Sequence, residues 1–258
     1  MRATSESESS IPAGSGTKAI DRALHVLSSF VENPDQGISD IASRSGLSPS
    51  TVHRIVRALV SGGYLEQDGE TDRYHLGHAA HVLGESARAA WSFDRALPVL
   101  EHIGSITGES VNMGILDGTD VVVILRVESV QPLRLDQPPG TRISVHCSSM
   151  GKALMAYTDA PLDEITFTKI TDSTITSGRD YEKDLAGVRE RGYSTDHEES
   201  LPGVSCVATP ILDSNGLATA AIAVQGPTVR MTEERMATIS SQLMESAAEI
   251  QRLLGFAN

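Results

Sequence analysis

The sequence contains few cysteines, because only Cys147 and Cys206 occur among its 258 residues. Two cysteines cannot build the disulfide framework of a small secreted domain, and these two lack the short spacing of a metal-ligand set. We therefore expect a reduced, cytoplasmic protein that carries neither a metal ion nor another cofactor.

Long apolar runs are also missing, since no stretch approaches the roughly 20 residues that a membrane-spanning helix needs. The first sixteen residues, MRATSESESSIPAGSG, are polar and lack the apolar segment of a secretory signal. We expect them to form a disordered tail. Hydrophobic residues make up 40% of the chain, which supports the cores of two domains at this length.

An excess of positive charge is absent as well. The formal net charge is −13, which argues against a protein that coats nucleic acid. Residues 17–78 carry six Lys/Arg and eight Asp/Glu, whereas residues 79–258 carry fourteen and twenty-four. The negative charge therefore belongs mostly to the second part of the chain, and any DNA affinity must come from a local, salt-sensitive patch.

Residues 38–76 read ISDIASRSGLSPSTVHRIVRALVSGGYLEQDGETDRYHL and predict two helices followed by a hairpin. The first helix, Ile38–Ser45, ends at Gly46, which tolerates the positive φ of a turn. Ser48 and Pro49 form the N-cap and first turn of the second helix. A Tyr-Leu strand and a Tyr-His-Leu strand then flank a polar turn. This order is typical of a winged helix-turn-helix, which binds DNA.

The second helix has two distinct faces at the helical period of 3.6 residues. Val52, Ile55, Val56 and Leu59 should pack inward, and the opposite face carries two arginines and no carboxylate between Ser48 and Ser61. Such a face can enter the major groove and read bases; the less favoured alternative is that the arginines are ordinary solvated charges. The residues expected to contact DNA are Arg44, Ser48, Ser50, Thr51, His53, Arg54, Arg57 and Arg73.

The remaining pattern predicts an α+β second domain with a mainly antiparallel sheet covered by helices. A helix capped by Thr17 precedes the DNA module, with an apolar stripe of Ile20, Leu24, Leu27 and Val31. Further helices are expected over His78–Ser92, Phe93–Ile106, Met150–Tyr157, Tyr181–Arg191 and Thr232–Leu254. Strands are expected over Val111–Leu116, Val121–Val127, Leu133–Leu135, Ile143–His146, Tyr193–Glu198, Cys206–Leu212 and Ala218–Val224.

From Lys18 to its end the chain resembles the IclR family of bacterial transcriptional regulators. The resemblance rests on KAIDRALHVLSSF, SDIASRSGLSPSTVHRIVRALVSGGYL and RYHLG in the first part, and on HCSSMGKALMAY, RGYSTDHEESLPGVSCVATPILDSNG and AAIAVQGPTVRM in the second. It implies a winged helix-turn-helix over 17–77, a linker helix over 78–93, and a GAF-like domain over 94–258 that binds effector and oligomerises. Members typically act as homodimers or homotetramers on palindromic operators of catabolic genes.

Several residues of the second domain are candidates for effector binding. Ser149, Met150 and Gly151 lie at an expected strand-to-helix junction, where free N–H groups suit a polar oxygen. The resemblance places the pocket at positions that match Leu135, Ile143, Ser149, Met150, Asp196, Val204, Cys206, Ala223 and Gln225. Three of them have a plainer interpretation: Cys206 as a small core residue, Asp196 as a turn cap, and Ser149 as a helix cap.

The chain departs from the glyoxylate-responsive type of the family. Small hydroxylated residues tend to stand there at the positions of Ala223 and Gln225, and a Gly-Ala pair at those of Ser149 and Met150. An ionised Asp196 would repel a bare carboxylate. We therefore expect a ligand that also carries a hydrogen-bond donor, such as an amide, a hydrazide or a hydroxyl.

Three classes of function fit parts of this pattern. A repressor of a catabolic operon, released or modulated by a small organic acid or amide, accounts for both domains; such a protein needs no membrane. A cysteine-dependent enzyme is the second class, but adjacent strand residues such as His146 and Cys147 point to opposite faces and form no dyad. The third is a ligand-independent architectural DNA-binding protein, which the acidic second domain disfavours.

Overall fold

The computed structural model describes residues 17–256, and the tail expected over residues 1–16 lies outside them. Nothing is described of the side chains of residues 32 and 89–91. The chain divides into two compact units between Trp91 and Ser92. Within the described residues, no helix combines the length and apolar character that crossing a membrane requires.

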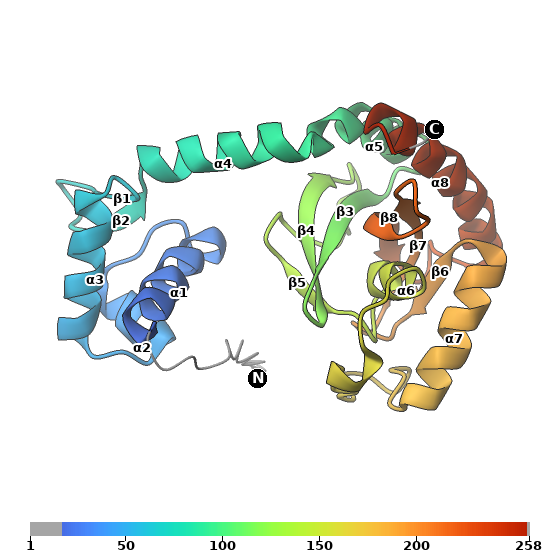
Figure 1. Ribbon diagram of the computed structural model, residues 1–258, viewed down its shortest axis with the longest axis horizontal. Coiled ribbons are helices and arrows are strands. Elements are labelled where there is room, and N and C mark those ends of the chain that lie inside the picture. Colours follow the sequence, from blue (N-terminus) through green and yellow to red (C-terminus); the bar gives the residue numbers. More distant parts are fainter. Residues whose placement is uncertain (1–16, 257–258) are drawn as a thin grey trace. The chain divides into compact units, whose positions relative to one another are not determined.

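The first unit consists of helices and one small hairpin. Its elements are α1 (Lys18–Glu32), α2 (Ile38–Ser45), α3 (Pro49–Ser61), β1 (Leu65–Gln67), β2 (Tyr74–Leu76) and α4 (His78–Trp91) (Figure 1). Gly46 ends α2 with a φ of 65°, and the Ser48 hydroxyl accepts the Thr51 N–H at 3.3 Å at the start of α3. β1 and β2 pair antiparallel. The predicted winged helix-turn-helix is confirmed in these details.

Helix α1 packs on the core with a different face from the one predicted. Val26 and Phe30 are buried against Ile41, Val52 and Val56. Three of the four stripe residues are instead more than half exposed: Ile20, Leu24 and Val31. Thr17 is the N-cap residue of α1, as predicted, but its hydroxyl donates to Asp21 and makes no side-chain capping hydrogen bond to the backbone.

The second unit is built around one six-stranded sheet. Its strands are β3 (Ser110–Asp117), β4 (Asp120–Val127), β5 (Arg142–Ser144), β6 (Ser194–His197), β7 (Val204–Leu212) and β8 (Ala218–Pro227), in the order β5-β4-β3-β8-β7-β6. Every neighbouring pair is antiparallel, which confirms the predicted sheet. Its helices are α5 (Leu97–Thr107), α6 (Ser149–Met155), α7 (Gly178–Arg191) and α8 (Glu233–Leu253), with short 3₁₀ turns at Phe93–Ala96 and Leu162–Glu164.

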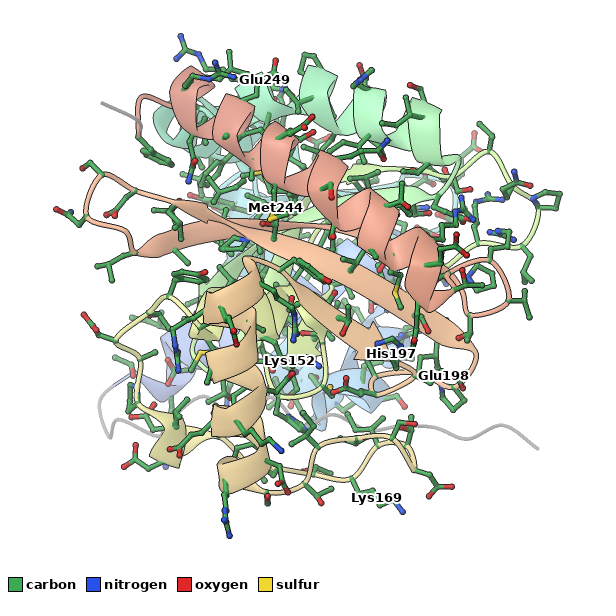
Figure 2. The ribbon with its side chains drawn as sticks, turned by 90° about the vertical axis from the view of Figure 1, so that its right-hand side faces the viewer. Lys152, Lys169, His197, Glu198, Met244 and Glu249 are labelled. Carbon is green, nitrogen blue, oxygen red and sulfur yellow. The ribbon has the colours of Figure 1, made fainter. Side chains whose placement is uncertain are left out.

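Helices cover both faces of the sheet. On one face, Leu100 of α5 and Leu243 of α8 share a core with Val111 and Ile222. On the other, residues of α6 and α7 share a second core with Ala208, Ala221 and Ala223. Figure 2 shows α8, with Met244 and Glu249, on one side of the strands and Lys152 of α6 on the other. Alternate residues of each strand therefore face different helices.

The structure corrects two predicted strands. Residues 133–135 form no strand; prolines at 132, 138 and 139 flank this segment, and a proline cannot donate to a ladder at its own position. The strand predicted over Ile143–His146 is β5, which ends at Ser144, and residues 145–147 turn toward α6. This segment therefore runs from the edge of the sheet straight into the second core.

Candidate functional site

The outward face of α3 matches the predicted DNA-contacting surface. Ser50, His53, Arg54 and Arg57 are exposed, while Val52 and Val56 are fully buried beneath them. Among residues 17–256, neither Arg54 nor Arg57 has an ion-pair partner. Both guanidinium groups are therefore free to meet phosphate or base edges.

Two other predicted DNA contacts have partners within the protein. Arg73 of the hairpin donates from Nε to Asp35 Oδ2 at 2.6 Å and from a terminal nitrogen to Asp40 Oδ2 at 2.9 Å. These bonds hold the hairpin against the start of α2. The Ser48 hydroxyl is shared between the Thr51 N–H and the Ser50 and Thr51 hydroxyls. Arg44 is exposed near the end of α2.

The predicted effector residues of the sheet form one row on the face covered by α6 and α7. The register places Asp196 opposite Cys206, Cys206 opposite Gln225, and Gln225 opposite Ser110. All four side chains are at least nine-tenths buried. Residues from four neighbouring strands, far apart in sequence, therefore meet side by side, with Ala223 and Val204 on the same face.

The Asp196 carboxylate already has partners in its own loop. Its oxygens accept the Glu199 N–H and the Ser200 hydroxyl, each at 2.7 Å. Burial raises the pKa of Asp196, while the hydrogen bond from Ser200 lowers it. The turn-capping interpretation of Asp196 is therefore correct.

The start of α6 lies against this row. Ser148 is the N-cap, its hydroxyl accepting the Gly151 N–H at 3.1 Å. The Ser194 hydroxyl donates to the Ser149 carbonyl at 2.6 Å. A Cβ built on Gly151 would meet the Val145 Cα and carbonyl oxygen at 2.4 Å, so the close packing of α6 on the turn before it requires glycine.

The other predicted residues surround the row less tightly. A Cβ built on Gly114 of β3 would lie 3.2 Å from the Met150 sulfur, which places Met150 against the middle of the sheet. Ile143 of β5 packs partly buried on the same core. Leu135 is half-buried in the segment that joins β4 to β5.

Sequence reasoning missed two polar residues on this face. Asn112 of β3 is fully buried, and the register places it opposite Ala223 of β8 and Arg126 of β4. It donates from Nδ2 to Gln137 Oε1 at 3.1 Å, and Arg126 pairs with Glu128 and Asp136. The available signal was Asn112 itself, a polar residue inside an apolar strand.

A buried ion cluster joins α6, α7 and the loop after β6. Lys152 Nζ lies 2.6 Å from Glu199 Oε1 and 3.1 Å from Asp184 Oδ2. Burial raises the pKa of Glu199 to about 7, against the lowering effect of Lys152. Because the Glu199 N–H also binds Asp196, this cluster fixes the loop that borders the row.

Neither cysteine is placed for nucleophilic chemistry. Burial raises the pKa of Cys147 to about 12 and that of Cys206 well above its usual value, so both remain thiols. His146 bonds through Nε2 to the Thr168 carbonyl. The predicted separation of His146 and Cys147 by strand alternation is wrong, because both residues lie in a turn.

Two surface hollows lie outside the predicted site. One, of about 190 Å³, is lined by residues that include Tyr193, His197 and Met236. The other, of about 440 Å³, is lined by residues that include Lys169, Thr171 and Glu198; Figure 2 labels His197, Lys169 and Glu198. Neither hollow is lined by a predicted effector residue.

Comparison with known proteins decides the family. Residues 92–252 match the family described as "Bacterial transcriptional regulator IclR C-terminal", and residues 19–69 match "IclR helix-turn-helix domain". The chain belongs to the IclR family. The HTH-type transcriptional regulator BhcR of Paracoccus denitrificans is 38% identical over 242 residues, which are 91% of this chain and 86% of BhcR. The transcriptional repressor IclR of Escherichia coli is 30% identical over 257 residues, or 95% and 92%.

Solved structures agree with this assignment. The IclR structure from Thermotoga maritima has a TM-score of 0.73 and 30% sequence identity, covering 92% of this chain and 98% of that one. An IclR homolog from Microbacterium hydrocarbonoxydans, complexed with 4-hydroxybenzoate, has a TM-score of 0.78 at 24% identity, covers 92% and 99%, and supports the fold alone. The chain is therefore an IclR-family transcriptional regulator, and its relatives are regulators, not enzymes.

Proposed function

We propose that this IclR-family regulator is a repressor of a catabolic operon, released by a small organic acid or its amide. The observation that carries the proposal is the row of buried polar side chains under α6, which includes Asp196 and Gln225. A core that needed only stability would be apolar here, since buried polar groups cost free energy unless they are bonded.

DNA binding by α3 requires two copies of the chain in this proposal. Residues 17–78 carry a net charge of only −2 in formal terms, so one module should bind DNA weakly. Exposed apolar side chains on two helices of the first unit support a homodimer or homotetramer through these helices: Ile20, Leu24 and Val31 of α1, and Val82 and Leu83 of α4. The operator would be an inverted repeat with half-sites about 10 bp apart, or a multiple of that.

The effector would bind between the start of α6 and the sheet. Its proposed contacts are Leu135, Ile143, Ser149, Met150, Gly151, Asp196, Val204, Cys206, Ala223 and Gln225. Asp196 accepts the Glu199 N–H and the Ser200 hydroxyl, and an ionised carboxylate has acceptor capacity for a further donor on the ligand. Effector can change operator affinity only by binding the two arrangements of the DNA modules unequally.

Selection of operator DNA from a random pool tests the DNA half of the proposal. We expect an inverted repeat, and light scattering at micromolar concentration should give a dimer or larger. A monomer that binds the selected DNA with full affinity would contradict it. Calorimetry then tests the effector half with Asp196→Asn. We expect weaker effector binding and unchanged effector-free operator affinity; unfolding midpoints control for the loss of the loop hydrogen bonds.

Wild-type effector affinity in both Asp196→Asn and a bulky Cys206→Trp variant would place the pocket elsewhere. The Cys206→Trp variant is the stricter test of the pocket's location, because the Cys206 side chain lies at the middle of the row between Asp196 and Gln225. Far-ultraviolet circular dichroism would establish that the Cys206→Trp variant retains its fold.

A further inference from the structure

Three strand residues on the sheet face covered by α6 and α7 each have a buried polar atom with no hydrogen-bond partner among the described residues. These atoms are Asn112 Oδ1, Gln225 Nε2 and Arg126 Nε. Asn112 and Gln225 are both at least 97% buried, and the Arg126 side chain is only 13% exposed. Native proteins leave few buried polar atoms unpaired, and such groups call for a specific explanation.

The sheet register brings these three residues together. Arg126 stands directly opposite Asn112 on the neighbouring strand β4. On the other side of Asn112 lies Ala223, and Gln225 is the next residue of β8 on the same face. Asn112 and Gln225 are thus diagonal neighbours, close enough for one small molecule to span their side chains.

Their chemistry is complementary to one kind of ligand. Arg126 and Gln225 each present a donor, and Asn112 presents an acceptor. A hydroxyl can accept from Gln225 and donate to Asn112 at once, whereas a keto or aldehyde oxygen only accepts. A carboxylate beside the hydroxyl would accept from the Nε–H of Arg126, because guanidinium donors favour carboxylate oxygens.

We propose that Asn112, Gln225 and Arg126 are specificity-determining residues that select a small hydroxy acid as effector. The inference rests on the proposed function, because it names the ligand class of the same site. Small side chains flank the diagonal between Asn112 and Gln225, because Ser110 stands opposite Gln225 and Ala223 opposite Asn112. The matched carboxylic acid without the hydroxyl would leave Asn112 and Gln225 unpaired and should bind more weakly.

Asp136 and Gln137 give this site a covering segment. Asp136 pairs with Arg126, and Gln137 accepts the Asn112 amide proton. Asp136 is largely exposed, so its carboxylate can leave the guanidinium without losing a buried position. An entering hydroxy acid would therefore bind under the segment that joins β4 to β5.

Calorimetric titration of the full-length protein tests the proposal with three matched sets of probes. Each set contains a hydroxy acid, its 2-oxo acid and its deoxy acid: glycolate, glyoxylate and acetate; lactate, pyruvate and propionate; 2-hydroxybutyrate, 2-oxobutyrate and butyrate. In at least one set, we expect the hydroxy acid to bind at least about tenfold more tightly than both partners. Lactamide, tested beside lactate, measures how much the contact between the carboxylate and Arg126 contributes to affinity.

Variants assign the preference to residues. Asn112→Leu and Gln225→Leu keep the approximate volume and should remove the preference for the hydroxyl. Asn112→Asp keeps the acceptor but adds a negative charge. It should therefore weaken the binding of all three acids while keeping their order of affinity, and it replaces the leucine variants if these do not fold. Gln36→Leu is the control, because Gln36 is a buried glutamine with an unpaired oxygen in the other unit, and it should leave the preference unchanged.

Three results would overturn the proposal. Equal binding of hydroxy, keto and deoxy acids is the first, and a preference that survives in Asn112→Leu and Gln225→Leu is the second. The third is that no hydroxy acid binds with a Kd below about 10 mM, which marks negligible affinity. If another small molecule still releases operator DNA in these cases, the proposed function stands without this ligand class; if none does, the proposed function fails as well.

Discussion

Replacing Gly151 with alanine should destabilise the second unit and displace the start of α6. The added Cβ would lie 2.4 Å from two backbone atoms of Val145, about 1 Å inside ordinary contact. Val145 cannot easily yield, because it is fully buried, its N–H donates to the Thr119 carbonyl, and its carbonyl accepts the Tyr181 hydroxyl at 3.0 Å. Overpacking of this kind costs about 1–3 kcal/mol.

We expect the upper part of that range, since both obstructing atoms belong to the backbone. At about 2–4 °C per kcal/mol for a chain of this size, the unfolding midpoint should fall by about 5–10 °C. Differential scanning calorimetry measures it, with Gly178→Ala in α7 as the matched control. There the added Cβ would meet only two Phe167 ring carbons, at an ordinary 3.6 and 3.9 Å. A Gly151→Ala protein as stable as Gly178→Ala would refute the close-packing argument.

Two further predictions concern DNA reading and pH. Arg54→Ala and Arg57→Ala should each weaken operator binding by about 1–3 kcal/mol and relax base preference at one position, as measured by fluorescence anisotropy; wild-type affinity in both would reject α3 as the reading helix. Because burial raises the pKa of Glu199 from 4.5 to about 7, the folded protein holds a proton there that the unfolded chain releases. The Glu199 contribution to the free energy of unfolding should therefore decrease as pH rises from about 4.5 to about 7. Glu199→Gln should make the unfolding midpoint depend less on pH across this window.

The sequence predicted elements wherever local signals and tertiary packing agree. The Ser48 cap, Gly46 and the alternation of the hairpin all indicate the same winged helix-turn-helix, which the structure contains. The prediction of the inward face of α1 was wrong, because periodicity alone cannot say which of two apolar faces packs inward. Val26 and Phe30 pack in the core, and Ile20 and Leu24 remain exposed.

The candidate site was predictable only in part. The resemblance supplied positions such as Asp196, Cys206 and Gln225, and the sheet register brings these side by side. Asn112 and Lys152 could not be assigned, because their roles depend on pairings between distant segments. Lys152 reads as an ordinary surface lysine in a helix, yet its ammonium group is buried between Glu199 and Asp184.

Operator affinity measured with and without effector tests the central claim most directly. The assay is fluorescence anisotropy of the selected inverted repeat, titrated with full-length protein in the presence and absence of the small acid that binds most tightly in calorimetry. The account predicts that effector weakens operator binding at least about fivefold, the lower end of usual coupling between sites, and that Cys206→Trp abolishes this response while binding the operator normally. Identical operator affinity with and without the bound effector would contradict it.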